Sequence, residues 1–328
     1  MNVGIDVAPL VLDNAGTARY VRGLLQGLAV REDVQVREVT WGGDGRLTAA
    51  VRDVAWYPLL LPLQARSLDL LHCTTFRAPL RSTVPVVITV HDLAVVRHPE
   101  LFTTWTRAYA RTLLLPVLRA ARAVLAVSEF TKREVTELAG VPDHRVRVAY
   151  NAADPALFRP DGPAAEGDYV LAVGTLEPRK NLRRLIEATG LLDLELRVAG
   201  AAGWGSVEVA APHVTWVGRP DDEELAKLLR GAACLAYPSL YEGFGIPVLE
   251  AMLCGTPVVT SSDSAMEEVA DGAAELVNPR DVESIAVGIE RALARRDELR
   301  AAGLERARRF SWAATGEAAA AAYREASA

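Results

Sequence analysis

The chain has 328 residues, half of them hydrophobic and 24% charged, which is typical of a folded protein large enough for two domains. Its formal net charge of −6 argues against broad nucleic-acid binding, which requires clustered positive charge. We expect a cytoplasmic protein rather than a membrane-spanning, secreted disulfide-rich or zinc-ribbon protein, because there is no apolar run of about 20 residues, no basic signal region and no C-x-x-C pair.

Strands and helices alternate along the first half of the chain. Short apolar runs indicate buried parallel strands, and the amphipathic segments between them indicate helices. The predicted strands are Asn2–Val7, Val34–Val39, Leu68–His72, Val86–Val90, Ala123–Val127 and Val146–Ala149. The predicted helices are Thr17–Ala29, Thr103–Ala121 and Glu129–Ala139.

The same alternation continues in the second half. The predicted strands are Tyr169–Val173, Glu195–Ala199, Val214–Val217, Ala233–Ala236, Pro257–Thr260 and Ala274–Val277. The predicted helices are Asn181–Gly190, Asp222–Arg230, Pro247–Leu253 and Val282–Ala294. The pattern predicts an α/β protein with two doubly wound Rossmann-like domains that face a cleft.

The domain boundary is expected in the segment Asp154–Asp168, which is rich in proline, glycine and acidic residues and has no periodicity. We therefore predict an N-terminal domain over residues 1–158 and a C-terminal domain over residues 159–310. Residues 311–328 are predicted to form an alanine-rich helix. Ligands of such sheets bind where strands end, so the loops after the strands are the candidate sites.

The most informative loop is YEGFGIPVLEAMLCGTPVV, which begins at Tyr241 after a predicted strand. Gly243 and Gly245 allow the backbone to approach a ligand, and the amides at the start of the following helix suit a phosphate. Glu242 and Glu250 are suited to accepting hydrogen bonds from sugar hydroxyls on either side of that phosphate. The structural alternative is that Glu242 caps the helix and Glu250, expected in its first turn, favours the helix dipole.

A second loop, GTLEPRKN, runs from Gly174 to Asn181, also between a strand and a helix. Asn181 is a natural helix N-cap. Arg179 and Lys180 place two cations at the strand end, where they neutralise phosphate charge and stabilise a departing diphosphate. The alternative is an ordinary solvated pair of basic residues, although the chain has only three lysines.

Two further loops follow strands of the first half. Residues Asn14 to Thr17 are predicted to form a tight turn into a helix, without the G-x-G-x-x-G pattern of dinucleotide-binding proteins. His91, in ITVHDL, is placed to hydrogen-bond a reacting sugar, although a lone histidine is as often structural. Ser128 is better explained as the N-cap of the next helix. No D-x-D motif and no metal-ligand spacing of histidines occur, so no metal is expected.

Taken together, these segments resemble the family-four retaining glycosyltransferases of the GT-B fold. The resemblance covers nearly the whole chain. It is carried by the E-x7-E pair Glu242 and Glu250, by GTLEPRKN, by the HD after a strand, by the Gly16 loop and by the tail FSWAATGEAAAAAYREA. It implies a hexosyltransferase that retains the anomeric configuration and moves a sugar from a nucleotide sugar to a carbohydrate, glycolipid or small-molecule acceptor.

The resemblance also implies roles for residues of the C-terminal domain, which would bind the donor. Glu242 would contact the hydroxyls of the donor sugar, Glu250 the ribose and Lys180 the diphosphate. Backbone amides around the segment Gly243, Phe244, Gly245 and Ile246 would reach sugar and phosphate. The nucleotide base would be received at Val217, Gly218 and Arg219.

In the N-terminal domain, which would bind the acceptor, the resemblance implies that Gly16 and Thr17 lie against the diphosphate and His91 near the transferred sugar. The helix of residues 311–328 would cross back onto this domain. One position departs from the family: many members have an arginine where this chain has Thr175. Arg179 is expected to supply that charge, as in a subgroup that resembles mannosyltransferases using GDP-mannose for surface polysaccharides.

Alternatives remain open from the sequence alone. A nucleotide-sugar epimerase shares this fold, and a non-catalytic nucleotide-sugar-binding subunit is a different class. A peripheral contact with the inner membrane face is a further hypothesis, based on arginines around the helix Thr103–Ala121, for which a core-facing helix is the alternative. The donor, the acceptor, the linkage and the oligomeric state are not determined by the sequence.

Overall fold

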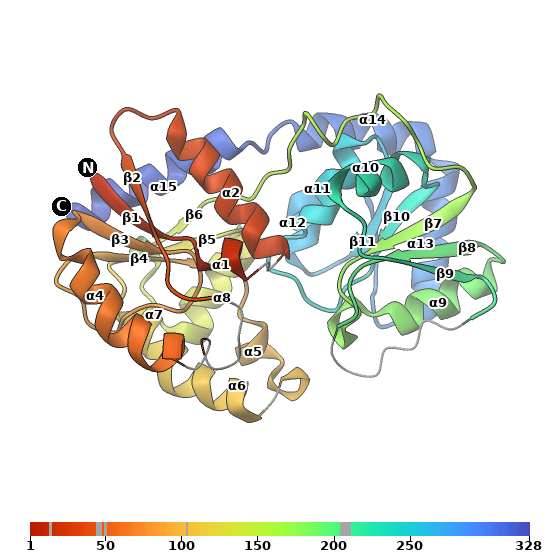
Figure 1. The fold of residues 1–328 in the computed structure, drawn as a ribbon. Helices are drawn as coiled ribbons and strands as arrows, with labels where there is room; N and C mark the ends of the chain where they lie inside the picture. Colours follow the sequence, from red (N-terminus) through yellow and green to blue (C-terminus); the bar gives the residue numbers. More distant parts are fainter. Residues whose placement is uncertain (13–14, 44–47, 49–50, 103, 204–210) are drawn as a thin grey trace. The chain divides into compact units, whose positions relative to one another are not determined.

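The computed structural model describes residues 1–12, 15–43, 48, 51–102, 104–203 and 211–328 (Figure 1). The chain divides into two compact units, an N-terminal unit of Met1–Ala152 with Ser311–Ala328 and a C-terminal unit of Ala153–Phe310. The boundary predicted from the sequence lies after residue 158, six residues later. Each unit contains one six-stranded sheet, so the predicted α/β class with two doubly wound parallel sheets is confirmed.

The sheet of the N-terminal unit is parallel throughout, with the strand order β2-β1-β3-β4-β5-β6. Its strands are β1 (Asn2–Asp6), β2 (Gln35–Val39), β3 (Leu70–Cys73), β4 (Val86–Val90), β5 (Ala123–Ala126) and β6 (Val146–Val148). Strands β3, β4 and β5 are buried along their whole length, as continuous apolar runs predict. The order of strands reverses between β1 and β3, which marks the topological switch point of this sheet.

Helices cover both faces of this sheet. They are α1 (Ala8–Val11), α2 (Ala15–Ala29), η1 (Arg52–Leu60), α4 (Leu61–Gln64), η2 (Ala65–Ser67), α5 (Ala94–Arg97), η3 (Pro99–Leu101), α6 (Thr104–Tyr109), η4 (Ala110–Leu114), α7 (Leu115–Ala120), α8 (Glu129–Ala139), η5 (Asp143–Arg145) and α15 (Trp312–Ser327). Helix α8 begins where Ser128 accepts a hydrogen bond from the amide of Thr131, so the predicted capping role of Ser128 is confirmed.

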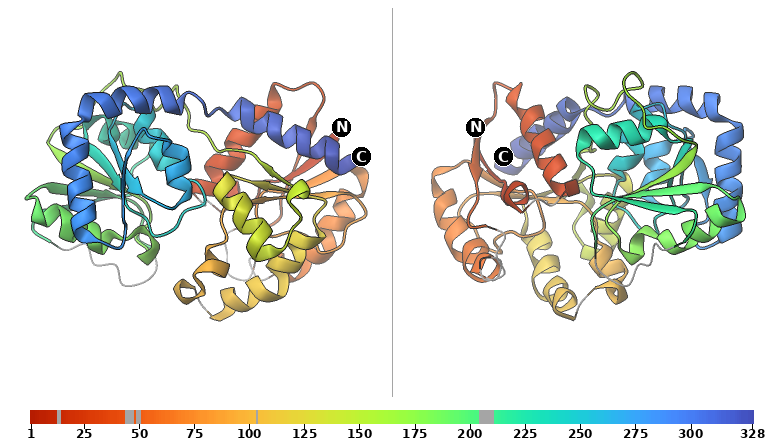
Figure 2. Two further views of the ribbon diagram at one scale, coloured as in Figure 1. Left: turned by 180° about the vertical axis from the view of Figure 1, so that it is seen from behind. Right: turned by 45° about the vertical axis from the view of Figure 1, so that its right-hand side comes forward.

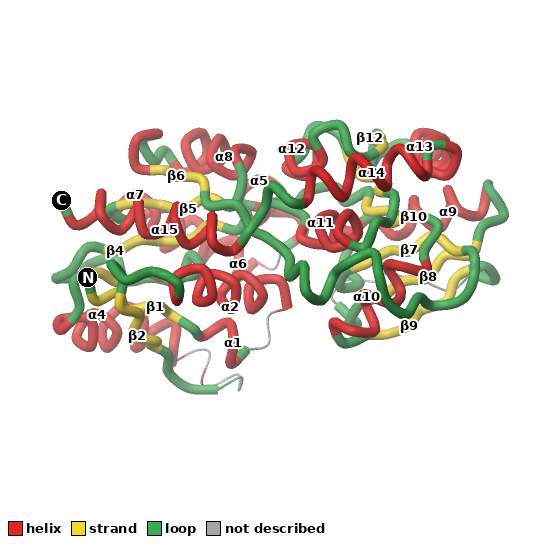
Figure 3. Tube along the Cα trace, turned by 90° about the horizontal axis from the view of Figure 1, so that it is seen from above, coloured by secondary structure: helices red, strands yellow, loops and turns green. Residues whose placement is uncertain are grey.

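Helices α2 and α15 share one face of the sheet, and their contact is unusually close. A Cβ atom on Gly27 of α2 would lie 1.9 Å from the carbonyl oxygen of Trp312 in α15. Helix α15 continues across β3, β4, β5 and β6 (Figure 3). The two chain ends therefore lie near each other (Figure 2), and Asp33 binds both the N-terminal ammonium through its carbonyl and Arg324 through its carboxylate.

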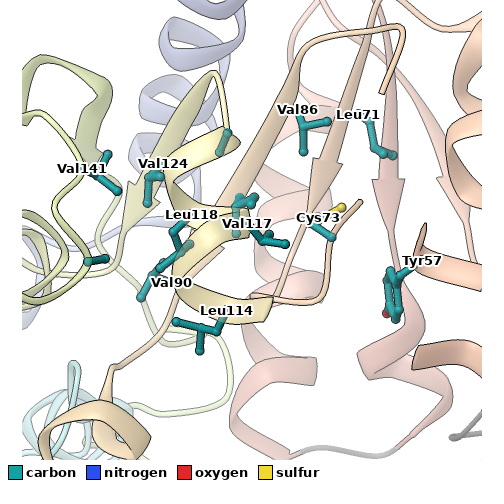
Figure 4. Close-up of a cluster of buried hydrophobic side chains, with 14 of the residues drawn as sticks. Tyr57, Leu71, Cys73, Val86, Val90, Leu114, Val117, Leu118, Val124 and Val141 are labelled. Atoms are coloured by element: carbon teal, nitrogen blue, oxygen red, sulfur yellow. The ribbon is translucent and has the colours of Figure 1, made fainter. Parts of the chain in front are cut away.

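The opposite face carries η1, α4, α7 and α8. Their apolar side chains form a hydrophobic cluster with side chains of the strands (Figure 4). Leu114, Val117 and Leu118 point toward strand residues such as Val90 and Val124. The predicted helix Thr103–Ala121 is interrupted by the π-helical segment η4, just before Pro116. Proline supplies no amide hydrogen, which favours such wider turns.

The C-terminal unit repeats this plan with the strand order β12-β11-β10-β7-β8-β9, again parallel throughout. Its strands are β7 (Tyr169–Val173), β8 (Glu195–Ala199), β9 (Val214–Gly218), β10 (Cys234–Tyr237), β11 (Val258–Ser261) and β12 (Glu275–Val277). Its helices are η6 (Pro178–Lys180), α9 (Leu182–Leu191), α10 (Asp222–Gly231), α11 (Ile246–Leu253), α12 (Ala265–Ala270), α13 (Val282–Ala294) and α14 (Arg296–Ala307).

Helices α9 and α13 pack together on one face of the second sheet through residues such as Leu185, Ala188, Ile285 and Ile289. The switch point of this sheet lies between β7 and β10, which are neighbours in space but separated by two strands in sequence. Among the helices of the described residues, none combines the length and apolar character that crossing a bilayer requires.

Candidate active site

The two loops that the sequence singles out in the C-terminal unit leave the carboxyl ends of β7 and β10, at the switch point of the sheet. A backbone hydrogen bond from the amide of Leu240 to the carbonyl of Arg179, 2.8 Å long, ties the two loops together. Because ligands of doubly wound sheets bind at such points, the topology places the GTLEPRKN and EGFG segments where a substrate is expected.

Lys180 is held in this position by two oxygen atoms. Its ammonium Nζ lies 2.5 Å from the hydroxyl of Tyr237 and 2.7 Å from Oε1 of Glu242, and it sits 4.8 Å from the centre of the Tyr237 ring. An ammonium has three N–H groups. Two of them therefore have acceptors among the described residues, and the third remains for a ligand oxygen.

Gly174 makes this position of the lysine geometrically feasible. Its φ of 140° lies in a region that favours glycine, and a Cβ atom there would be 2.9 Å from Cε of Lys180. The first glycine of GTLEPRKN is thus required both by the backbone conformation and by the path of the lysine side chain across it.

Arg179 is bound by carboxylates on both sides. Its guanidinium donates to Oε2 of Glu242 at 2.5 Å, to Oε1 of Glu177 at 2.6 Å and to the carbonyl of Tyr241 at 2.9 Å. Sequence reasoning predicts Arg179 as a diphosphate-binding cation. The structure shows that its charge is already compensated within the unit, so its direct effect is to orient Glu242.

Glu242 is the centre of this cluster, with a side chain only 10% exposed. Burial by itself raises the pKa of this carboxyl group, but the charges of Arg179 and Lys180 outweigh it and lower the pKa to about 2. The same ion pair keeps Lys180 charged: burial lowers the lysine pKa, while the Glu242 carboxylate raises it above its ordinary value. Glu242 does not cap helix α11, so the capping alternative is wrong.

Tyr237 is a functional candidate that sequence reasoning misses. Its hydroxyl contacts Lys180 and donates to Oε1 of Glu242 at 3.1 Å, while burial and then the Glu242 charge raise its pKa to about 12. The sequence contains one feature that could have indicated this role: Tyr237 is the last residue of β10 and directly precedes the loop.

The loop after β10 leads into helix α11 through Gly245, whose φ is 98°. Gly243, Phe244 and Ile246 are buried beside it. Glu250 lies in the second turn of α11, not in the first as predicted, and is 1% exposed. Phe244 packs edge-on against Phe310, with ring centroids 5.8 Å apart.

Other predicted donor-binding residues lie on neighbouring loops of this unit. Thr175 follows β7 and is exposed. Val217 and Gly218 end β9, where Gly218 has a φ of 74° and the Val217 side chain is 37% exposed. Asn181 occupies the N-cap position of α9 but does not cap it, since its amide instead donates to the carbonyls of Pro238 and Pro279.

In the N-terminal unit, Gly16 and Thr17 lie in the first turn of α2 rather than in a preceding turn. Asn14 lies outside the described residues. A Cβ atom on Gly16 would meet nothing within 4 Å, so the packing of this unit does not require a glycine there.

His91 follows β4 and is partly buried. Its Nε2 lies 2.8 Å from the carbonyl oxygen of Thr74. A carbonyl only accepts, so Nε2 carries the proton and Nδ1 is the acceptor nitrogen of the neutral ring. Burial lowers the His91 pKa, opposed by the Thr74 carbonyl, and the ring of Tyr20 packs against the imidazole at 4.8 Å and 84°.

A chain of buried hydroxyls and one histidine joins strands β3 and β4 to helices α15 and α2. His72 of β3 joins Tyr323 of α15 through Nδ1 and Thr89 of β4 through Nε2, each at 2.7 Å. Thr89 in turn joins Tyr20 of α2 at 2.8 Å. Burial lowers the His72 pKa to about 3, so the ring is neutral and its nitrogens serve as one donor and one acceptor.

Within the described part of the chain, no three histidine, cysteine, aspartate or glutamate side chains converge as a metal ion would require. The three cysteines are buried and unpaired.

Comparison with known proteins agrees with this geometry. The family model described as "Glycosyl transferases group 1" matches residues 154–310, and the model "Glycosyltransferase Family 4" matches residues 15–157. The chain therefore belongs to glycosyltransferase family 4, and it is a glycosyltransferase of the GT-B fold.

Particular relatives extend this result. The O-antigen chain mannosyltransferase B of Escherichia coli is 31% identical, over 95% of this chain and 96% of its own length. The O-antigen chain mannosyltransferase RfbU of Salmonella typhimurium is 29% identical, over 72% of this chain and 70% of its own. Sucrose-phosphate synthase from Thermosynechococcus elongatus shares the fold with a TM-score of 0.81 and 21% identity, covering 99% of this chain and 98% of its own. The transferase interpretation is thus favoured over an epimerase.

Proposed function

We propose that the chain is a retaining, metal-independent mannosyltransferase, which moves mannose from GDP-mannose to a hydroxyl of a glycan, glycolipid or natural-product acceptor. The observation that carries this proposal is the position of the Lys180 ammonium at the switch point. Glu242 and Tyr237 hold it there, and one of its three N–H groups has no acceptor among the described residues. The choice of mannose rests on relatives that are named mannosyltransferases, among them the two O-antigen chain enzymes reported above.

The diphosphate of the donor is the part that Lys180 recognises. When the bond between sugar and phosphate breaks, negative charge grows on the departing diphosphate. A fixed ammonium in a partly dehydrated site stabilises this charge without having to reorganise, which is the largest contribution expected from such a group. Arg179 contributes indirectly, because it holds Glu242 and thereby the lysine in place.

The two glutamates of the E-x7-E segment have separate roles. Glu242, ionised because of its lowered pKa of about 2, accepts hydrogen bonds from hydroxyls of the donor sugar. Glu250, on α11, binds the ribose. The backbone amides of Gly243 to Ile246 bind sugar and phosphate at the start of the helix.

Retention of configuration follows if the acceptor hydroxyl attacks from the face that the diphosphate leaves. A departing phosphate oxygen then takes the hydroxyl proton, and no separate general base is required. No metal ion takes part, because the Lys180 ammonium, held in place by the Glu242 carboxylate that Arg179 orients, supplies the positive charge that a metal would otherwise provide. Neutral His91 accepts a hydrogen bond from a sugar hydroxyl through Nδ1.

The acceptor binds to the N-terminal unit and the donor to the C-terminal unit. We further propose that the enzyme works on the cytoplasmic side of the membrane, in peripheral contact with it.

The donor assignment is tested by the shift in melting temperature caused by GDP, UDP, ADP and dTDP. A ligand at a hundred times its Kd stabilises the native state by about 2.7 kcal/mol, which is readily measured. We expect GDP to give the largest shift and Glu250→Ala to abolish it. Glu187→Ala, an exposed glutamate on α9, serves as the control and is expected to keep the shift. A shift with UDP alone would overturn GDP-mannose, and no shift with any nucleotide would contradict the site itself.

A further inference from the structure

The N-terminal unit exposes a row of large apolar side chains on one helical segment and an adjoining loop. Their exposed fractions are 72% for Val54, 62% for Leu59, 44% for Leu60, 51% for Leu63 and 48% for Leu80. We call these five residues the leucine face. Single exposed leucines need no explanation, but several on one segment mark a contact surface.

The segment that carries the leucine face is apolar on its inner side as well. Trp56, Tyr57 and Leu61 of η1 and α4 are at most 6% exposed and belong to the core cluster of the sheet. A surface helix of a soluble protein normally turns a polar face outward. Val54 and Leu59 are five residues apart, which brings them to the same side because hydrogen bonds in a π-helix run from i to i+5.

Two arginines lie at the edge of the leucine face. One pocket is lined by Pro62, Leu63, Arg66, Arg81, Ser82 and Thr83. Arg66 and Arg81 are exposed, and neither forms an ion pair with a described residue. The pocket therefore combines two arginines, for which the described residues offer no ion-pair partner, with two hydroxyls and apolar surface. Its charge is complementary to a phosphate at the border of a lipid layer.

The helix that the sequence suggests for membrane contact, Thr103–Ala121, is less suited. Four of the five arginines in and around this segment are engaged within the unit: Arg97 with Glu134, Arg107 with Thr104, Arg119 with the Ala139 carbonyl and Arg122 with the Ala326 carbonyl. Its apolar side chains Leu114, Val117 and Leu118 face the core.

We propose that the leucine face, with Arg66 and Arg81, docks onto an anionic lipid surface, the leucines entering the acyl boundary and the arginines binding headgroup phosphates. A second copy of the chain is a poorer occupant, because a two-fold contact through this face would bring Arg66 and Arg81 near the same arginines of the other copy. The inference deepens the proposed membrane contact by naming its surface and does not depend on the identity of the donor.

The test is co-sedimentation of the full chain with vesicles of phosphatidylcholine alone or of phosphatidylcholine with about one third phosphatidylglycerol, which gives the surface a negative potential. We expect binding to the anionic vesicles only. Arg66→Ala with Arg81→Ala should weaken it roughly thirty-fold, because each arginine near such a surface contributes about 1 kcal/mol and 1.4 kcal/mol is tenfold. Leu59→Ser with Leu63→Ser should weaken it roughly a hundred-fold.

Matched controls change equally exposed residues elsewhere. Val30→Ser with Leu191→Ser removes two apolar side chains that are 75% and 66% exposed, and Arg183→Ala removes an arginine that is 91% exposed. These variants should bind as the wild type does. The melting temperature, with and without GDP, shows that every variant is folded and reports separately on the donor site.

Three results would overturn the proposal. The first is no binding of the wild type to anionic vesicles. The second is equal weakening by the control variants. The third is a concentration-dependent dimer, detected by sedimentation velocity, that Leu59→Ser with Leu63→Ser abolishes, because it would assign the leucine face to a second copy of the chain.

Discussion

Among single residues, Lys180 is the one on which the proposed reaction depends most. We expect Lys180→Ala to lower kcat by 10²–10³, about 2.7–4 kcal/mol in the barrier, as the loss of a preorganised electrostatic donor does. Lys227→Ala is the matched control, since among the described residues the Lys227 side chain pairs only with Glu224, exposed on α10, and its loss should leave turnover unchanged. Steady-state kinetics with saturating donor distinguishes the two, and near-normal turnover in Lys180→Ala would refute the assignment.

Asp6 is a second residue whose environment leads to a measurable prediction. It is fully buried at the end of β1, where it accepts hydrogen bonds from the amide of Ala8 at 3.0 Å and the hydroxyl of Tyr57 at 2.9 Å. Burial nevertheless raises its pKa from 3.8 to about 6. Between these values the native state keeps a proton that the unfolded chain has lost, so stability falls as the pH rises.

The size of this effect is about 3 kcal/mol, from about 1.4 kcal/mol per pKa unit. Asp6→Asn has no such titration. The free energy of unfolding of the wild type, relative to that of Asp6→Asn, should therefore decrease between pH 4 and pH 7, as urea denaturation at several pH values would show. A constant difference across this range would mean that the Asp6 carboxyl is not perturbed in the native state.

At the scale of elements, the contact between α2 and α15 decides the stability of the N-terminal unit. Gly27→Ala places a Cβ atom 1.9 Å from the backbone oxygen of Trp312, and backbone atoms cannot rotate away as a side chain can. We expect a loss of about 2 kcal/mol or more, despite the better helix propensity of alanine. Thermal or urea denaturation measures it.

The control for this change is Gly16→Ala in the same helix, where a Cβ atom meets nothing within 4 Å. Its stability should be unchanged or slightly higher. If both variants were equally stable, the two helices would have to pack less closely than the structure shows.

At the scale of the whole molecule, the last helix stabilises a unit from which it is far removed in sequence. Ala319, Ala320 and Tyr323 of α15 are completely buried against the sheet of the N-terminal unit. A chain ending at Phe310 also leaves Nδ1 of His72 without its partner Tyr323 in a buried site. The loss is expected to exceed the 3–5 kcal/mol typical of removing one buried aromatic side chain.

This loss should be confined to one unit. Limited proteolysis followed by mass spectrometry should find new cleavages within residues 1–152 of the truncated chain, while residues 153–310 stay protected. A chain ending at Ser327, which keeps α15 whole, is the control. Equal protection of both units after truncation at Phe310 would show that α15 is dispensable for the N-terminal unit.

The sequence by itself determined the strands, the two sheets and the segments of the candidate site. These features depend on short-range patterns: apolar runs at strand length, amphipathic spacing in helices, and glycine, lysine and glutamate directly after strands. The predicted bounds of β7, β8 and α13 agree with the structure residue for residue. In each of these segments, the hydrophobic periodicity and the residues that mark its two ends lie within about a dozen residues of one another.

Only the tertiary structure decided which of these groups meet. Tyr237 reaches Lys180 from 57 residues away, and Tyr323 reaches His72 from 251 residues away, distances at which no local pattern is informative. Likewise, Leu59 and Leu61 are two residues apart and both apolar, yet only Leu61 is buried. Hydrophobicity predicts that such residues leave water, but which of them do so depends on the sheet that packs against the helix.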